Sequence, residues 1–73
     1  SGLYEDLLAA DKNGDIVSGD GIVLVGRRSR RLVYDGVGGF HEPGGCPVIR
    51  CRSEDDGSHA YIKKGDFDAW RKI

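Results

Sequence analysis

The stretch PVIRCRSEDDGSHAYIKK, residues 47–64, has the clearest secondary-structure pattern in the chain. Apolar and polar side chains alternate on both sides of a polar centre, which is typical of two half-buried strands joined by a turn. The dipeptide Asp56-Gly57 in that centre is favoured in two-residue hairpin turns. We therefore expect residues 47–53 and 59–64 to form an antiparallel β-hairpin.

A turn centred on Asp56 and Gly57 also predicts which side chains share a face. It places three pairs opposite one another: Arg52 with Tyr61, Cys51 with Ile62, and Arg50 with Lys63. The inward face then carries Ile49, Cys51, Ala60 and Ile62, and the outward face carries Arg50, Arg52, Tyr61 and Lys63. Because opposed like charges weaken a sheet, the cationic outward face indicates an anionic partner. The alternative is a solvated face whose cations pair with nearby acids.

A second hairpin is predicted by GIVLVGRRSRRLVYDG, residues 21–36, in which four arginines surround one serine between two apolar runs. Ser29 and Arg30 are not favoured in tight two-residue turns, so we expect a looser loop of three or four residues. Its arginines, Arg27, Arg28, Arg30 and Arg31, form either a solvated turn or an anion-binding tip.

The remaining segments predict the outer parts of the fold. Residues 3–10 have helical apolar spacing with acids in the first turn, and Asn13-Gly14 ends that helix. Ile16 and Val17 begin a short strand.

Two further segments lie in the middle and at the C-terminal end of the chain. Residues 35–45 contain five glycines and a proline, which predicts an irregular connection or a flap. Residues 66–73 predict a second helix, capped by Asp66, with Phe67 and Trp70 facing the core.

These elements predict a single α+β domain over residues 1–73. Two antiparallel β-hairpins form a small twisted sheet or partly open barrel, with a short helix at each terminus. A 73-residue chain buries only about 60% of its unfolded surface, which disfavours a deep catalytic cavity. Ser1-Gly2, without an initiator methionine, indicates either a remnant of tag removal or a piece cut from a longer protein.

Charge and hydropathy narrow the class of partner. The net charge of -1 conceals an asymmetry, because residues 1–21 carry one lysine and five acids whereas residues 22–73 carry ten basic and seven acidic side chains. No apolar run approaches the roughly 20 residues of a membrane span, so we expect no membrane partner.

Two residue sets have partial metal-binding patterns. Asp11, Asn13 and Asp15 match the start of a calcium loop, but isoleucines stand where its glycine and glutamate are required. The candidate zinc ligands His41, Cys46, Cys51 and His59 contain no Cys-x2-Cys pair, and the hairpin turns Cys51 and His59 to opposite faces. We expect no metal and no cofactor, with a structural zinc as the alternative.

The two cysteines bear on compartment and catalysis. A Cys46–Cys51 disulfide would have to span too great a length of one strand, so we predict free thiols and a reducing compartment, the cytoplasm. Neither cysteine lies at a predicted helix start, and burial would raise the pKa of Cys51, so we expect no enzyme.

The last stretch, HAYIKKGDFDAWRKI, resembles the wing strand and closing helix of excisionase-type winged DNA-binding proteins. Tyr61, Lys63, Phe67 and Trp70 stand in the matching places. That resemblance implies DNA binding, but it covers some fifteen residues, and residues 16–53 do not predict the helix-turn-helix that should precede it.

The sequence therefore predicts a non-enzymatic protein-interaction module, an adaptor or inhibitor. We expect it to dock on an acidic protein surface through eight residues: Arg27, Arg28, Arg30, Arg31, Arg50, Arg52, Tyr61 and Lys63. The alternative is a nucleic-acid-binding domain that uses the same residues, with Tyr61 stacking on a base.

Overall fold

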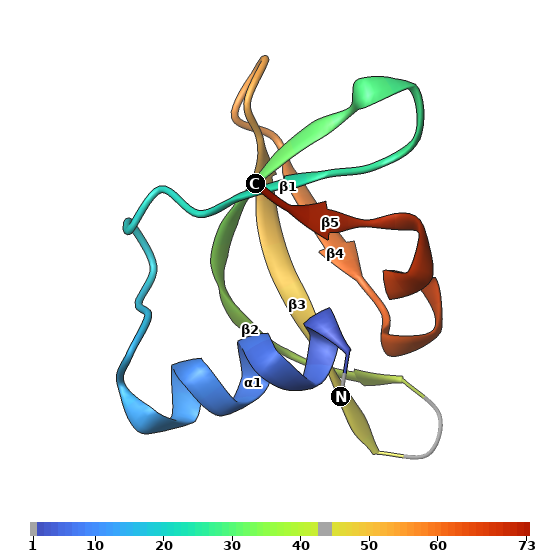
Figure 1. Ribbon diagram of the computed structural model, residues 1–73. Coiled ribbons are helices and arrows are strands. Elements are labelled where there is room, and N and C mark those ends of the chain that lie inside the picture. Colours follow the sequence, from blue (N-terminus) through green and yellow to red (C-terminus); the bar gives the residue numbers. More distant parts are fainter. Residues whose placement is uncertain (1, 43–44) are drawn as a thin grey trace.

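The computed structural model describes residues 2–42 and 45–73, and its elements are shown in Figure 1. Its helix and strands are α1 (Leu3–Asn13), β1 (Val23–Val25), β2 (Arg31–Glu42), β3 (Cys46–Ser53), β4 (His59–Ile62) and β5 (Arg71–Lys72). Two 3-10 turns span Arg27–Ser29 and Lys64–Ala69. The predicted α+β class is confirmed.

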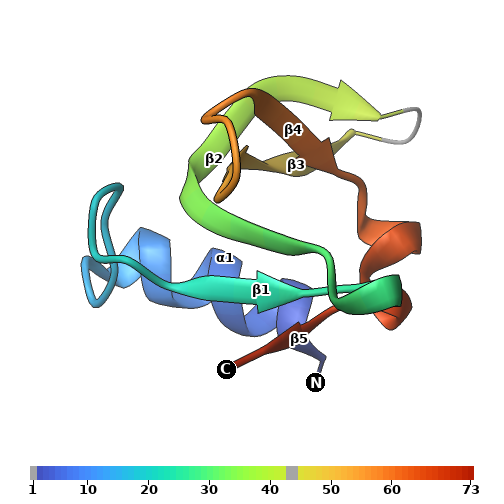
Figure 2. The ribbon, with the colours of Figure 1, turned by 90° about the horizontal axis from the view of Figure 1, so that it is seen from above.

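The strands form one antiparallel sheet in the order β4-β3-β2-β1-β5. Both expected hairpins are present, as β1–β2 and β3–β4, and the pairing of β2 with β3 sets them side by side. Figure 2 shows the sheet curled, with β3 and β4 on one side and β1 and β5 on the other. The sheet is open, because the edge strands β4 and β5 are not neighbours in it.

The loop predicted over residues 35–45 was wrong for residues 35–42, which belong to β2, while residues 43–44 lie outside the described part of the chain. Its glycines bend the strand and allow close contact with β3. Gly36 has a φ of 112°, in the region that favours glycine, and the β2–β3 register shifts beside it. At Gly38 a Cβ atom would lie 2.8 Å from Cγ2 of Val48. Glycine-rich sequence therefore marks a bent strand here rather than a connection.

The turn of the β3–β4 hairpin is longer than predicted. The Ser53 N–H donates to the Ser58 carbonyl at 2.7 Å, so the turn contains residues 54–57. The observed pairs are Ile49 with Ile62, Arg50 with Tyr61, Cys51 with Ala60, and Arg52 with His59. The three predicted pairs were wrong by two residues. A shift of two keeps every side chain on its face, so the predicted inward and outward sets are confirmed.

The N-terminal region matches its prediction in part. Helix α1 ends at Gly14, which has a φ of 79° and lies where the sequence placed the stop. The strand expected at Ile16 and Val17 was wrong, because these residues belong to the connection to β1 and the Val17 side chain is exposed. Two apolar residues between turns are fewer than the three or more residues of a usual strand.

The C-terminal helix predicted over residues 66–73 was also wrong in extent. A 3-10 turn occupies Lys64–Ala69, without a side-chain cap from Asp66, and the chain then enters β5 beside β1. Because a 3-10 turn has three residues per turn, Phe67 and Trp70 still fall on one side. The resemblance to a winged DNA-binding protein therefore lacks its closing helix.

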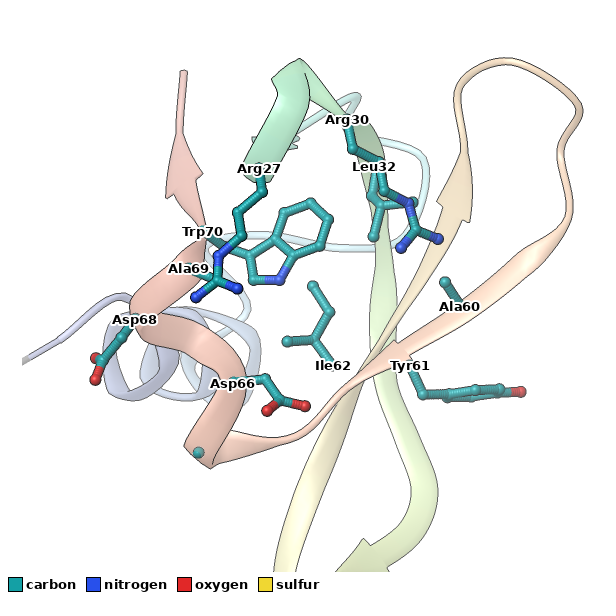
Figure 3. Close-up of a pocket in the computed structure, with 11 residues that line it drawn as sticks. Arg27, Arg30, Leu32, Ala60, Tyr61, Ile62, Asp66, Asp68, Ala69 and Trp70 are labelled. Carbon is teal, nitrogen blue, oxygen red and sulfur yellow. The ribbon is translucent and has the colours of Figure 1, made fainter.

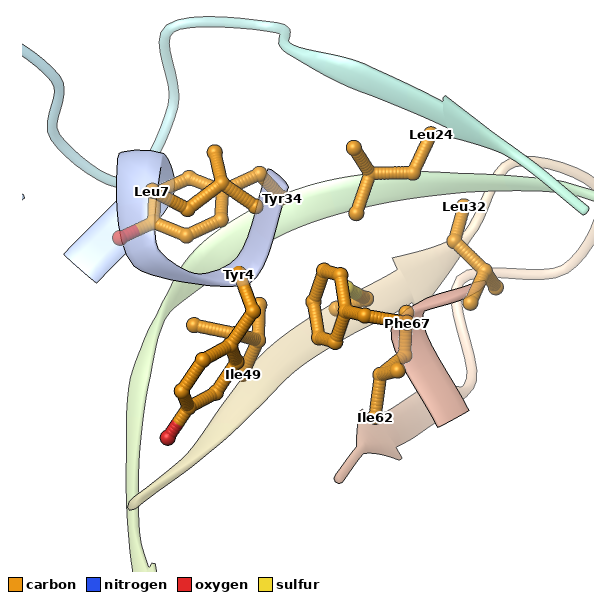
Figure 4. Close-up of a cluster of buried hydrophobic side chains, with 9 residues drawn as sticks. Tyr4, Leu7, Leu24, Leu32, Tyr34, Ile49, Ile62 and Phe67 are labelled. Carbon is orange, nitrogen blue, oxygen red and sulfur yellow. The ribbon is translucent and has the colours of Figure 1, made fainter. Parts of the chain in front are cut away.

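The core lies between α1, the concave side of the sheet and the second 3-10 turn (Figure 4). Tyr4 of α1 meets Phe67 edge to face, with ring centroids 5.3 Å apart. The buried Tyr34 hydroxyl donates to the Asp11 carboxylate, and burial raises the pKa of Tyr34 above its usual value. This core fixes the base of both hairpins while their loops stay exposed.

Candidate binding site

A cleft of about 440 Å³ opens between the loop that carries Arg27, Arg28 and Arg30, called here the arginine-bearing loop, and the edge strand β4 (Figure 3). Its sides come from the β1–β2 hairpin, from β4 and from the second 3-10 turn. The residues that line it are Arg27, Arg30, Leu32, Ala60, Tyr61, Ile62, Gly65, Asp66, Asp68, Ala69 and Trp70. The cleft is therefore lined by residues of both hairpins, which are far apart in the sequence, and lies where the curled sheet stays open.

Trp70 is held in the cleft by contacts on its ring. A Cβ atom at Gly26 would lie 2.9 Å from three atoms of the indole ring, so only glycine lets the ring lie this close to the loop. The Arg30 guanidinium carbon lies 5.9 Å from the ring centroid, within range of a cation–π interaction. These contacts fix the position of the indole ring.

The loop that carries Arg27, Arg28 and Arg30 has an unusual backbone. The Gly26 N–H donates to the Arg30 carbonyl at 2.8 Å, which closes the loop. Arg28 and Ser29 both have a φ of 58°, a region that residues with a Cβ atom adopt at a cost. Among the side chains that the structure describes, those of residues 2–38 and 45–73, none of the three arginines forms an ion pair. Their charges are presented to solvent and to the cleft.

The outward arginines of β3 are in a different electrostatic setting. Arg50 Nε lies 3.3 Å and Arg52 Nε lies 3.6 Å from the Asp35 carboxylate, and Arg50 also donates to the Asp35 carbonyl at 2.8 Å. The Ser18 hydroxyl donates to the same carboxylate at 2.6 Å. That hydrogen bond, with the two guanidinium groups, lowers the pKa of Asp35. Asp35 therefore balances part of the charge on this face.

The other expected site residues flank these two groups. Arg31 forms an exposed ion pair with Glu54 at 2.7 Å. Tyr61 lies opposite Arg50 in the sheet, lines the cleft and is 47% exposed, so it borders both the outer face and the cleft. Lys63 is exposed one residue beyond β4, away from the position opposite Arg50 that the sequence predicted.

The sequence missed the acidic side of the cleft. Asp66 was expected as a helix cap and Asp68 was not considered, yet both line the cleft across from Arg27. Trp70 was expected as a core anchor, and it packs partly against the core while forming a side of the cleft. The signal available in the sequence was the stretch DFDAW, whose aspartates alternate with apolar side chains.

The cysteines are free thiols. Cys51 is fully buried, and burial raises its pKa to about 12, so its thiol stays protonated and unreactive at neutral pH. Cys46 is partly exposed.

The candidate metal sets are not assembled in the part of the chain that the structure describes. No group of three potential ligands there is placed to hold a metal ion. Cys51 faces the core and His59 is exposed on the other face, while the His41 side chain lies outside the described residues. Asp11 and Asn13 lie within α1, and the Asp11 carboxylate accepts the Tyr34 hydroxyl.

No family model, curated protein or solved structure matches this chain. Within residues 2–42 and 45–73, no helix has the length and apolar character needed to cross a membrane.

Proposed function

We propose that the protein is a non-enzymatic protein-interaction module, an adaptor or inhibitor, that docks on an acidic partner. The supporting observation is the contrast among its arginines. Arg31, Arg50 and Arg52 have carboxylate partners within the fold, whereas Arg27, Arg28 and Arg30 have none among the described residues. Unpaired cations on one loop attract a negatively charged surface and raise the rate of encounter.

The backbone of the loop supports the same proposal. A loop needed only to reverse the chain favours glycine or asparagine at positions with positive φ, yet this loop carries Arg28 and Ser29 there. Strain at exposed positions is typical of binding loops that a rigid scaffold holds in place. The outer face, with Arg50, Arg52, Tyr61 and Lys63, supplies a second and weaker contact in this proposal.

A nucleic-acid-binding domain is the second candidate. Tyr61 favours it, because its exposed ring beside Arg50 has the arrangement on which bases stack. Asp66 and Asp68 favour a protein instead, since a protein surface can place a basic side chain beside its acidic ones, whereas a nucleic-acid backbone brings only negative charge toward these aspartates. The free thiols of Cys46 and Cys51 support a reducing compartment, the cytoplasm, for either function.

Affinity capture from a lysate of the source cells tests the proposal. We expect a protein to be retained by the unmodified chain, with or without nuclease treatment, and to be lost when Arg27 and Arg30 are both changed to Glu. The matched control changes Lys12 and Lys72 to Glu, which makes the same change in charge outside the cleft. Capture that disappears with nuclease would favour the second candidate. Capture that survives in the Arg27→Glu, Arg30→Glu variant would contradict the role of the loop.

A further inference from the structure

The cleft is lined by side chains of both charges. Arg27 and Arg30 stand on the loop side, and Asp66 and Asp68 stand on the side of the 3-10 turn (Figure 3). Within the described part of the chain, these four side chains form no ion pair with one another. The cleft therefore presents charges of both signs that are not paired with one another, and the Arg27 side chain reaches toward the 3-10 turn that carries the two aspartates.

Between the charged sides lies an apolar surface. The partly exposed indole ring of Trp70 supplies much of it, above Leu32 and Ile62, which are only 1% and 3% exposed and form the buried floor. The contact with Gly26 holds that ring in place, so little ordering is needed when a ligand binds. A volume of about 440 Å³ is within the usual range of ligand sites and exceeds that of one amino-acid side chain.

Charge complementarity selects the occupant. A nucleotide or a uniformly acidic peptide would gain contacts with Arg27 and Arg30 but would bring negative charge toward Asp66 and Asp68. A peptide with an acidic residue on one side of an apolar residue and a basic residue on the other satisfies both sides of the cleft.

We infer that the cleft binds a bipolar peptide segment of the partner. Its apolar side chain packs on the Trp70 ring above the buried Leu32 and Ile62, its acidic side binds Arg27 and Arg30, and its basic side chain faces Asp66 and Asp68. This inference rests on the proposed function as a protein-interaction module and specifies the kind of segment that the module recognises.

Trp70 is the only tryptophan in the chain and lines the cleft, so its fluorescence reports occupancy. The probes are capped nine-residue peptides with a central leucine, two glutamates on one side and two lysines on the other, made in both directions. We expect one direction to give a saturable change in Trp70 emission. Replacing the central leucine by serine should weaken binding by about tenfold, the effect of losing one buried apolar side chain.

Variants of the chain locate the binding. The change of both Arg27 and Arg30 to Gln, or of both Asp66 and Asp68 to Asn, should each weaken binding of the bipolar peptide by about tenfold or more. Lys12→Gln is the control, because Lys12 is exposed on α1 and belongs neither to the cleft nor to the proposed docking residues, and it should change affinity by less than about twofold. Circular dichroism verifies that each variant is folded.

Several results would overturn the inference. One is a peptide with glutamates on both sides that binds as tightly as the bipolar peptides. Another is binding that is lost in an Arg50→Gln, Arg52→Gln variant but kept when Arg27 and Arg30 are changed. Either result leaves the proposed function in place with a different site. No saturable signal up to about 1 mM peptide would also reject the cleft, and tighter binding of an oligothymidine probe would reject both the inference and the proposed function.

Discussion

The arginine-bearing loop and the outer face of β3 have similar compositions but different electrostatics. On β3, Arg50 and Arg52 share the Asp35 carboxylate, which the Ser18 hydroxyl also binds. On the loop, Arg27 and Arg30 have no carboxylate partner among the described residues, and Arg30 lies over Trp70. The two groups contain the same residue type, but their neighbours differ: carboxylates hold one group in the fold, and the other has none among the described residues.

Both groups of arginines lie on strands and loops that one core holds together. The largest loss of stability is therefore expected from a substitution in that core. Phe67 is 6% exposed and contacts Tyr4, so Phe67→Ala should destabilise the domain by about 3–5 kcal/mol. Domains of this size have little more stability than that in total. Chemical denaturation measures the loss, and the exposed Val17→Ala is the control, with an expected change within about 0.5 kcal/mol. A variant of Phe67 as stable as that control would contradict the core assignment.

A second substitution disturbs only the arginine-bearing loop. Gly26→Val places a side chain where the Trp70 ring stands, so the ring must move into solvent. We expect a red shift of tryptophan emission and a stability loss of about 1–3 kcal/mol.

The matched control for that variant is Gly65→Ala. Gly65 also lines the cleft, but a Cβ atom added there would meet no other described atom within 4 Å, so this change should leave both the emission and the stability unchanged. Unchanged emission in Gly26→Val would show that Trp70 does not pack against the loop.

A third substitution disturbs only the outer face of β3, where Asp35 holds the arginines. Because the pKa of Asp35 is lowered in the folded protein, its charge stabilises the fold above the usual aspartate pKa of about 4, and that stabilisation disappears as the pH falls further. Asp35→Asn should therefore lower the thermal midpoint at neutral pH and leave a smaller decrease between about pH 5 and pH 2. Thermal melts across this range measure the difference. The exposed Asp55→Asn is the control, and equal midpoints for Asp35→Asn and the unmodified protein at all pH values would contradict the Asp35 network.

The smallest effect is expected for the exposed pair between the two groups. Arg31→Gln breaks the ion pair with Glu54, and since both side chains are well exposed, the loss should be below about 1 kcal/mol. The double variant with Glu54→Gln should be no less stable than Arg31→Gln alone. A loss of several kcal/mol in denaturation would show that this pair, rather than the β2–β3 ladder, joins the hairpins.

Features that depend on residues close together in the sequence could be predicted, and features that depend on contacts between distant residues could not. Alternation along residues 47–53 identified the inward and outward faces correctly, because facing depends only on neighbours in the same strand. The register failed because it depends on the turn, and Asp56-Gly57 fits a four-residue turn as well as a two-residue one.

The site depended on contacts between distant residues. Asp35 meets Arg50 across the β2–β3 ladder, and Gly26 meets Trp70 across the β1–β5 edge. No local pattern predicts either contact from one sequence. The glycines of β2 were assigned to a loop for a related reason, because glycine at a turn and glycine at a close strand contact look the same in a sequence.

One measurement tests the difference between the two arginine groups most directly. In a ¹⁵N-labelled sample of the unmodified protein, the Nε–H resonances of all the arginine side chains are followed while one of the bipolar peptides is added. We expect the Nε–H resonances of Arg27 and Arg30 to shift progressively, and those of Arg50 and Arg52 to stay in place because Asp35 already binds these two side chains. Shifts confined to Arg50 and Arg52, with the loop arginines unmoved, would contradict this expectation.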